Sequence, residues 1–194
     1  TVTINPTTTT AFSDKNITDV GDIYADSLYS DAGSVQSIVL NSAGEINQPA
    51  QPCFLAYKST NSTDVTGDGT LFTVVCDTEI FDQGADHNIT TGIFTTPVTG
   101  RYFLVPGIYY NDIGAGHTLG EIRVVTSNRT YRLNICNVAN LANSFADLVF
   151  NAPIIADMDA GDTAYIQAYV LNSTKTVDVS TNTTLTSFAG SLIA

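Results

Sequence analysis

Short apolar runs separated by clusters of glycine, proline, asparagine and aspartate make up most of the chain. The runs are rich in valine, isoleucine, threonine, tyrosine and phenylalanine, a composition typical of β-strands. Strands are predicted at residues 34–41, 53–57, 71–75, 80–82, 92–95, 101–105, 107–110, 121–125, 131–135, 144–150, 164–171, 177–180 and 186–193. Short strands with turn signals between them indicate an all-β sandwich or jelly roll. No repeat unit recurs along the sequence, which excludes a solenoid or a propeller.

The stretch at residues 88–110 is the one around which the predicted strands are organised. Its first run is followed by Pro97, which lacks an amide donor, and by Gly100, which tolerates a positive φ, so a turn or a strand edge is expected there. The second run, residues 101–105, is almost wholly apolar. A strand of this kind should be covered on both faces, so its outer face is expected against another sheet or another subunit.

The N-terminal quarter of the chain differs from the rest. It opens with a threonine-rich, low-complexity stretch that predicts extended chain. Residues 17–28 carry apolar positions that fit a short helix, and Pro49 and Pro52 favour an extended hinge. Because this region has few large apolar residues, we expect it to be an arm that cannot fold alone. The predicted division is an anchoring arm at residues 1–51 and one folded domain at residues 52–194.

Composition and charge exclude several classes of function. The chain has 194 residues, of which 43% are hydrophobic and 13% charged, enough for a good core and unlike a disordered chain. A net charge of −12 with only seven Lys+Arg argues against nucleic-acid binding, because no track for phosphates can be built. No apolar run is long enough to span a bilayer, and no secretory signal pattern is found at the N-terminus. We therefore expect neither nucleic acid nor membrane insertion.

Cys53, Cys76 and Cys136 are odd in number and widely spaced. This spacing does not predict a disulfide framework, and no Cys/His cluster suggests zinc. We expect buried free thiols in strands. A chain of this kind folds in a reducing cytoplasm and then functions outside it, as virion proteins made in a host cytoplasm do.

Candidates for catalysis are few. His87 lies beside Asp86 and His117 lies in a glycine-rich loop, but neither belongs to a G-x-S-x-G or HExxH motif. The interpretation we favour is that both are loop histidines exposed to solvent, so no catalytic residue, no cofactor and no enzymatic activity are predicted. A glycan hydrolase is the enzyme alternative, and it would need two carboxylates about 5–10 Å apart in a cleft.

Calcium is the one metal ion that the sequence leaves open. Residues 64–69 have some features of a calcium loop but lack the glutamate at the twelfth position and the oxygen ligands between. Asp157, Asp159 and Asp162 are clustered, and a turn into the following strand explains them. No metal ligand is assigned, and a structural Ca²⁺ at a trimer axis or in a loop stays an alternative.

Three motifs, in the right order, resemble those of the C1q/tumour-necrosis-factor (TNF) superfamily. Residues 92–97 (GIFTTP) precede residues 100–104 (GRYFL), where the family has Phe-Thr-x-Pro and then Gly-x-Tyr-x-Phe. Residues 159–166 (DAGDTAYI) are similar to the family's Gly-Asp strand entry, and residues 186–193 (TSFAGSLI) to its terminal strand. The resemblance spans most of the chain and implies a jelly roll that assembles as a homotrimer.

The resemblance and the apolar run together predict which residues form subunit contacts. The residues expected at a trimer interface are Phe94, Tyr102, Phe103, Leu104 and Phe188. A second group lies on the loops that follow the central strand and is expected to face a ligand. It consists of Tyr109, Tyr110, Asp112 and His117. Tyrosine rings provide flat amphipathic surfaces on which sugars can stack.

The preferred function is structural. Residues 41–57 resemble the junction in bacteriophage fibre proteins where a shaft passes into a C1q-like head. A chain of 194 residues leaves no room for a long shaft and an adaptor. We therefore predict a capsid decoration or head-fibre protein, anchored through its arm to the major capsid protein or another virion protein.

Two other functions remain open at this stage. The chain could be the receptor-binding tip of a tail fibre, with loops that recognise a glycan on the host surface. It could also be a secreted C1q-like ligand of a cell receptor, although the collagen repeat and the signal pattern are missing.

Overall fold

The computed structural model describes residues 27–29, 36–181 and 183–194. The chain divides into two units, Thr1–Asn47 and Gln48–Ala194. In the first unit, β1 (Ser27–Tyr29), β2 (Gln36–Leu40) and β3 (Ile46–Asn47) form an antiparallel sheet in which β2 is central. The strand predicted at residues 34–41 is thus confirmed. The helix predicted at residues 17–28 lies outside the described residues except for its last two, which belong to β1.

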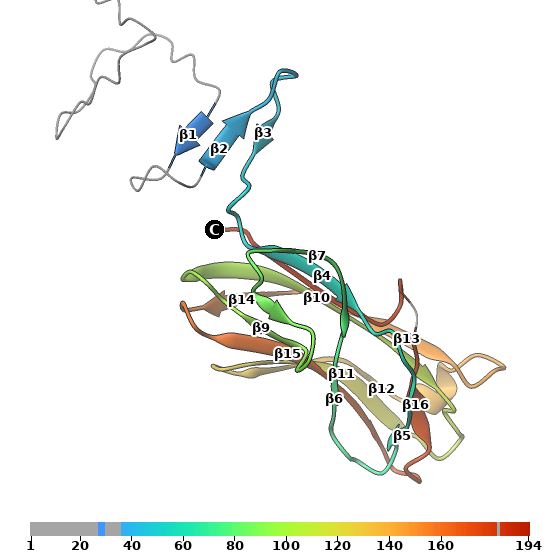
Figure 1. Cartoon of the computed structure of the whole chain (residues 1–194). Helices are drawn as coiled ribbons and strands as arrows, with labels where there is room; N and C mark the ends of the chain where they lie inside the picture. The colour runs from blue at the N-terminus through green and yellow to red at the C-terminus, as the bar shows by residue number, and fades with distance from the viewer. Residues whose placement is uncertain (1–26, 30–35, 182) are drawn as a thin grey trace, which may run out of the picture. The chain divides into compact units, whose positions relative to one another are not determined.

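The second unit consists of two antiparallel sheets packed face to face (Figure 1). An eight-stranded sheet contains β4 (Cys53–Tyr57), β5 (Ser62–Thr66), β7 (Thr78–Gln83), β10 (Gly100–Asn111), β13 (Leu148–Asn151), β14 (Ile154–Met158), β16 (Val177–Val179) and β17 (Ser187–Leu192). A six-stranded sheet contains β6 (Phe72–Val74), β8 (His87–Asn88), β9 (Ile93–Thr95), β11 (Leu119–Thr126), β12 (Thr130–Cys136) and β15 (Thr163–Leu171). A short 3₁₀ helix, η1 (Val138–Asn140), lies between β12 and β13.

The chain passes repeatedly from one sheet to the other. It crosses from β9 to β10 and back to β11, and again from β14 to β15 and back to β16. The strand orders are β5-β16-β10-β17-β4-β7 and β12-β11-β15-β9-β8, with β6 paired to β15. This is a jelly-roll sandwich, which confirms the fold class predicted from the apolar pattern.

Strand β10 is central, and it joins two of the predicted strands into one. On one side it pairs with β17, and on the other side with β14 and β13. Leu104 pairs with Ile154 and Gly107 with Asn151, so β13 and β14 follow one register and are two halves of a single edge. The edge is interrupted where Pro106 on β10 and Pro153 on the partner remove amide donors from the ladder.

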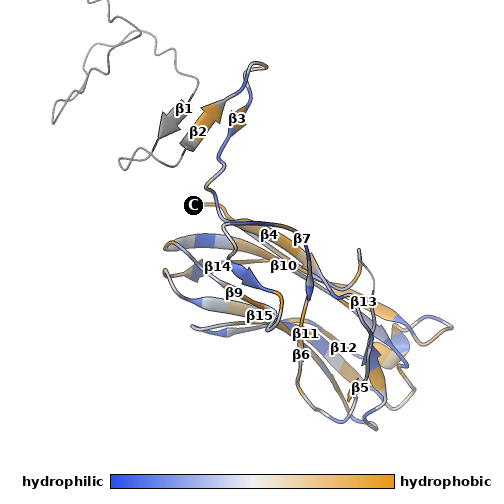
Figure 2. Ribbon diagram, viewed as in Figure 1, coloured by the Kyte–Doolittle hydropathy of each residue, from blue (hydrophilic) through white to orange (hydrophobic). Residues whose placement is uncertain are grey.

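The core lies between the sheets and follows the alternation of side chains along each strand. Burial alternates residue by residue in β4 and β15, and Figure 2 shows that the strands of both sheets contain apolar residues. At the centre Phe54 stacks on Phe94, with ring centroids 4.6 Å apart, and meets the edge of Phe188 at 5.1 Å. Burying a side chain of this size contributes roughly 1.5–3 kcal/mol.

The three cysteines are free thiols: Cys76 is buried and Cys53 and Cys136 are half-buried. Burial raises the pKa of the Cys76 thiol to about 12, so this thiol stays protonated and unreactive at neutral pH. Within the described ranges, no helix has the length and apolar character needed to cross a membrane.

The two ends of the sandwich differ in what they carry. The chain enters at Gln51 and Pro52, which bond to the backbone of Leu192 near the C-terminus. At the opposite end of β10 lie the loops at residues 111–118, 137–147 and 172–176. Entry and loops therefore occupy opposite ends of the second unit.

Candidate functional site

The outer face of the eight-stranded sheet is apolar over five adjacent strands, β7, β4, β17, β10 and β14. Phe81 on β7 is 48% exposed, Phe103 on β10 is 38% exposed, and Ile155 on β14 is 56% exposed. Between the two phenylalanines runs a groove of about 330 Å³. It is lined by Cys53, Phe54, Phe81, Phe103, Val105, Ala189, Gly190 and Ser191. We call this surface the outer groove.

The register of the strands explains why a groove forms there. Val105 on β10 pairs with Ala189 on β17. Ala189 pairs with Leu55 on β4, and Leu55 pairs with Phe81 on β7, so these four residues form one row across the sheet. In the next row Phe103 pairs with Ser191, which is also small. Large side chains on β10 and β7 therefore flank small side chains on β17, and a groove runs along β17.

Burial corrects the prediction of subunit contacts for four of its five residues. Phe94, Tyr102, Leu104 and Phe188 are at most 1% exposed and pack between the two sheets of one chain. They are core residues and cannot touch another subunit. Phe103 points away from the core, and its role at an interface stays a prediction.

The prediction that Tyr110 and His117 face a ligand is also corrected, because both are buried. The Tyr110 hydroxyl donates to the backbone oxygen of Glu121 at 2.8 Å, and burial raises the pKa of this phenol. The His117 Nδ1 accepts from the Gly114 amide at 2.8 Å, and its Nε2 lies 3.0 Å from the Thr174 oxygen. Both ring nitrogens are thus occupied: Nδ1 bonds within its own loop, and Nε2 links this loop to the loop at residues 172–176.

Tyr109 and Asp112 lie where a ligand could meet them. Tyr109 is half-buried and its hydroxyl donates to Asp147 at 3.0 Å, while Asp112 is exposed with a φ of 60°. The same end carries two exposed apolar side chains that the sequence analysis did not single out. Phe145 is 80% exposed and Leu141 is 56% exposed. Phe145 falls in the strand predicted at residues 144–150, but the strand begins only at Leu148, so this side chain lies in a loop.

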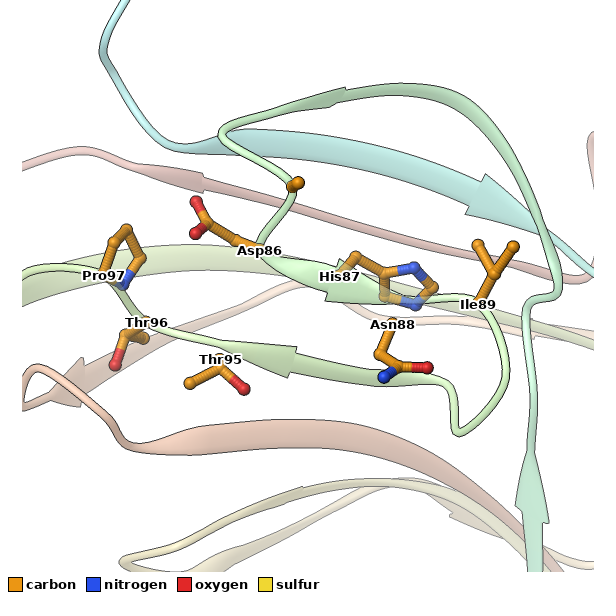
Figure 3. Close-up of a pocket in the computed structure, with 8 residues that line it drawn as sticks. Asp86, His87, Asn88, Ile89, Thr95, Thr96 and Pro97 are labelled. Atoms are coloured by element: carbon orange, nitrogen blue, oxygen red, sulfur yellow. The ribbon is translucent and has the colours of Figure 1, made fainter.

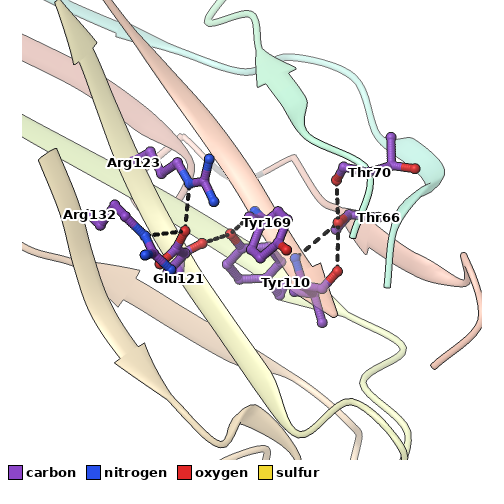
Figure 4. A network of polar contacts seen from close by, with 8 residues as sticks. Thr66, Thr70, Tyr110, Glu121, Arg123, Arg132 and Tyr169 are labelled. Carbon is purple, nitrogen blue, oxygen red and sulfur yellow. Dashed lines mark hydrogen bonds and ion pairs between the residues drawn. The ribbon is translucent and has the colours of Figure 1, made fainter. Parts of the chain in front are cut away.

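A buried carboxylate lies on the outer side of the six-stranded sheet. Glu121 is fully buried and is held by Arg123 Nε at 2.5 Å and by Arg132 Nη2 at 2.8 Å (Figure 4). The Arg123 guanidinium also covers the Tyr169 ring, 4.5 Å from its centroid. Because both carboxylate oxygens have arginine partners, this group is a structural link between strands.

A pocket of about 490 Å³ lies beside the β8–β9 hairpin. In Figure 3 the Asp86 carboxylate and Pro97 lie at one end of it and Ile89 at the other. Burial raises the pKa of Asp86, with a further contribution from the charge of Asp82. His87 lines the pocket, and neither of its ring nitrogens has a hydrogen-bond partner among the described residues.

Metal-ligand side chains do not gather in the described part of the chain: no group of three or more His, Cys, Asp or Glu there could hold an ion. The loop at residues 64–69 instead uses its polar groups locally. The Asp68 carboxylate accepts from the Thr70 amide, and hydrogen bonds from the Thr70 side chain and then from its amide lower the pKa of Asp68.

No protein-family model and no curated protein matches the sequence. Solved structures do match it. The globular domain of zebrafish complement 1qA aligns with a TM-score of 0.51 and 20% identity, over 74% of this chain and 98% of that one. Murine APRIL aligns with a TM-score of 0.51 and 14% identity, over 74% and 99%. The chain has the C1q/TNF-like jelly-roll fold.

The C1q/TNF-like fold confirms the jelly roll that the three sequence motifs implied. The motif residues Phe94, Tyr102 and Phe188 meet in the core, where the Phe94 and Tyr102 rings pack edge to face at 5.5 Å. The vertex protein P5 of PRD1 also aligns, at 10% identity and a TM-score of 0.49, which is too low for an inference about this chain.

Proposed function

We propose that this chain is a non-enzymatic structural protein of a virion, a trimeric capsid decoration or head-fibre protein. In this function residues 1–51 anchor it to the major capsid protein or another virion protein, and the jelly-roll head stands outward. The fold supports a structural or ligand-like role, and the head would supply the contacts between subunits.

The outer groove is the observation that carries the proposal. A monomer gains nothing by presenting two half-exposed phenylalanines, Phe81 and Phe103, on either side of an apolar groove. Burial of apolar surface contributes about 25 cal/mol per Å², and contiguous exposed apolar patches mark interaction sites. A second and a third copy of the chain are the occupants that the resemblance to trimeric proteins favours.

The positions of the chain entry and of the loops, at opposite ends of the head, support the proposed anchoring. Entry at Gln51 and Pro52 and the loops at residues 111–118 occupy opposite ends of the sandwich. An arm fixed to a capsid at the entry end leaves the loops free to face the medium. Low charge content and a net charge of −12 fit a protein that is exposed on a particle and does not contact the packaged nucleic acid.

Assembly is tested by light scattering on the full chain. We expect a mass near three times 20.6 kDa. Phe103→Asp would place a charge in the buried contact and should give monomers that keep the wild-type circular dichroism spectrum. The matched control is Ile46→Asp, at an exposed apolar residue of the first unit, which should stay trimeric. A wild-type monomer at micromolar concentration contradicts the assembly.

Position on the particle is tested by counting copies. A decoration protein should copurify with full heads, in copy numbers on the order of hundreds per particle. A tail-fibre tip should copurify with tails in few copies. The receptor-binding tip is the second candidate, and the exposed Phe145 and Leu141 at the loop end favour it. Recovery with tails alone would replace the decoration proposal by this one.

A further inference from the structure

The His87 imidazole is buried where the chain crosses from one sheet to the other. Strand β7 belongs to the eight-stranded sheet and β8 to the six-stranded sheet, and residues 84–86 join them. The His87 side chain is 0% exposed, which corrects the prediction of an exposed loop histidine, and neither Nδ1 nor Nε2 has a hydrogen-bond partner among the described residues. Native structures keep few buried polar atoms in this state, because each one costs roughly 1–3 kcal/mol.

Three of the surrounding strands offer the ring only aromatic neighbours. From β4 the Phe54 ring stacks on it, with centroids 5.0 Å apart and planes 10° from parallel. From β17 Phe188 meets it edge to face at 6.5 Å, and from β9 Phe94 is its register partner. A neutral imidazole suits this environment, and a charged one is poorly solvated there.

The titratable neighbours all come from β7 and the crossing segment. Glu79 Oε1 lies 3.9 Å from Nδ1 and is the nearest carboxylate to the ring. Asp82 accepts from the backbone amides of His87 and Asp86, so its carboxylate is already engaged. Asp86 is the adjacent residue and is itself partly desolvated.

Burial lowers the pKa of His87 below its ordinary value, and the charge of Asp82 opposes this only in part. An unfolded or opened chain therefore takes up a proton at higher pH than the closed structure does. The sign follows from linkage: the closed state is fully favoured above about pH 6.5 and loses stability as the pH falls below that value.

A β-bulge connects this histidine to the outer groove. Leu55 pairs with Phe81 and Ala56 with Glu79, so the register shifts between the two pairs. Because Leu55 is half-buried on the outer face and Ala56 is fully buried, the bulge turns Phe81 outward and Glu79 towards the sheet interior. One edge strand thus carries both the neighbour of His87 and a wall of the groove.

We propose that His87 and Glu79 form an acid-responsive latch that couples pH to assembly through β7. When His87 takes up a proton, the Glu79 side chain, which is 36% exposed, moves in to pair with it. Strand β7 follows because it is an edge strand that pairs, among the described strands, with β4 alone. Phe81 then shifts in the outer groove, and the contact between copies weakens. This inference rests on the proposed function, since it takes the groove as the contact.

The experiment uses the full chain at about pH 7.5 and about pH 5.5, on either side of the ordinary histidine pKa. Amide hydrogen exchange of β7 and the mass by light scattering are measured for wild type, His87→Phe and Glu79→Gln. In wild type we expect faster β7 exchange and a smaller mass at the lower pH. The rate of β7 amide exchange is expected to rise by up to about tenfold for each pH unit by which the pKa of His87 lies below its ordinary value.

The variants separate the latch from general acid sensitivity. His87→Phe keeps the aromatic stack and should lose the response. Glu79→Gln should lose the β7 response while its unfolding temperature drops further in acid, because the charged ring has no partner. Glu45→Gln, at an exposed glutamate of the first unit, should behave as wild type.

Failure of the latch and failure of the proposed assembly look different. A wild-type chain that is monomeric at both pH values contradicts assembly, but its β7 exchange still tests the latch. An acid response of β7 that persists unchanged in His87→Phe overturns the latch. An NMR titration in which the His87 ring shows the ordinary histidine pKa also overturns the latch.

Discussion

Gly67 occupies a loop position at the far end of the sandwich that a side chain cannot share. Its φ is +124°, in the left-handed region that favours glycine. A Cβ there would lie 2.1 Å from the Thr174 oxygen and 2.8 Å from His117 Nε2. The histidine contact that holds the two loops together therefore depends on the absence of a side chain at residue 67.

We predict that Gly67→Ala destabilises the domain by more than backbone strain alone. Strain at such a φ costs about 1–3 kcal/mol, and the contact with Thr174 adds to it. Gly161→Ala is the matched control, because its φ of +90° brings similar strain with nothing within 4 Å of the added Cβ. Urea unfolding measures both, and equal losses of stability would contradict the argument.

Two of the residues mispredicted from the sequence, Tyr102 and Leu104, share one cause. The run at residues 101–105 indicated correctly that both faces of the strand are apolar, but it could not tell which residues face which way. Tyr102 and Leu104 face the core, and Phe103 and Val105 face outward. Which set faces the core depends on how the run pairs with its partner strands, and the sequence of the run does not determine that register.

At the scale of elements, β12 is an edge strand that one buried carboxylate ties to its neighbour. Glu121 lies on β11, and Arg132 on β12 contacts both of its oxygens, at 3.0 and 2.8 Å from Nε. The other edge of β12 is unpaired among the described strands. The ion pair between Glu121 and Arg132 therefore adds a side-chain contact between β11 and β12, and β12 has backbone hydrogen bonds to β11 on one side.

We predict that Glu121→Gln lowers the free energy of unfolding by about 1.5–3 kcal/mol, the range for hydrogen bonds to charged groups. The loss should be accompanied by faster amide exchange in β12, because its side-chain tie is weakened. A double-mutant cycle with Arg132→Gln measures the coupling between the two residues. If the two losses simply add, Glu121 does not act through Arg132.

Elements were predicted more successfully than their boundaries. The strand at residues 53–57 is β4, residue for residue, because Pro52 precedes a continuous apolar run and polar residues follow it. The runs at residues 101–105 and 107–110 were separated at Pro106, yet they form one strand. Proline usually ends a central strand, and here it is accommodated because the partner strand is interrupted at the same level. The compensating residue, Pro153, is far from Pro106 in the sequence, so the residues around Pro106 do not predict it.

At the scale of the whole molecule, the division of the chain lies close to Gln48. The Gln83 Nε2 donates to the backbone oxygens of Gln48 and Gln51, and the Gln51 Nε2 donates to that of Leu192. Residues 48–51 are thus bonded to the sandwich. The predicted anchoring role of residues 1–51 stays a prediction, and the structural unit itself begins at Gln48.

We predict that removal of residues 1–47 leaves the head folded and still trimeric, but unable to attach to particles. Removal of residues 1–51 should in addition lower stability by about 1–3 kcal/mol, because several hydrogen bonds worth about 0.5–1.5 kcal/mol each are lost. Thermal unfolding of the two truncated chains checks the difference. Full decoration of particles by either truncated chain would show that the head carries the anchor.

The interruption of β13 and β14 at Pro153 also bears on aggregation. Within the described residues, nothing pairs with the far side of this edge. A long uninterrupted edge would be a template on which strands of other copies could add without limit. The proline divides it into pieces of four and five residues, with a missing donor between them. The interruption thereby keeps the open edge of the sandwich from seeding fibres.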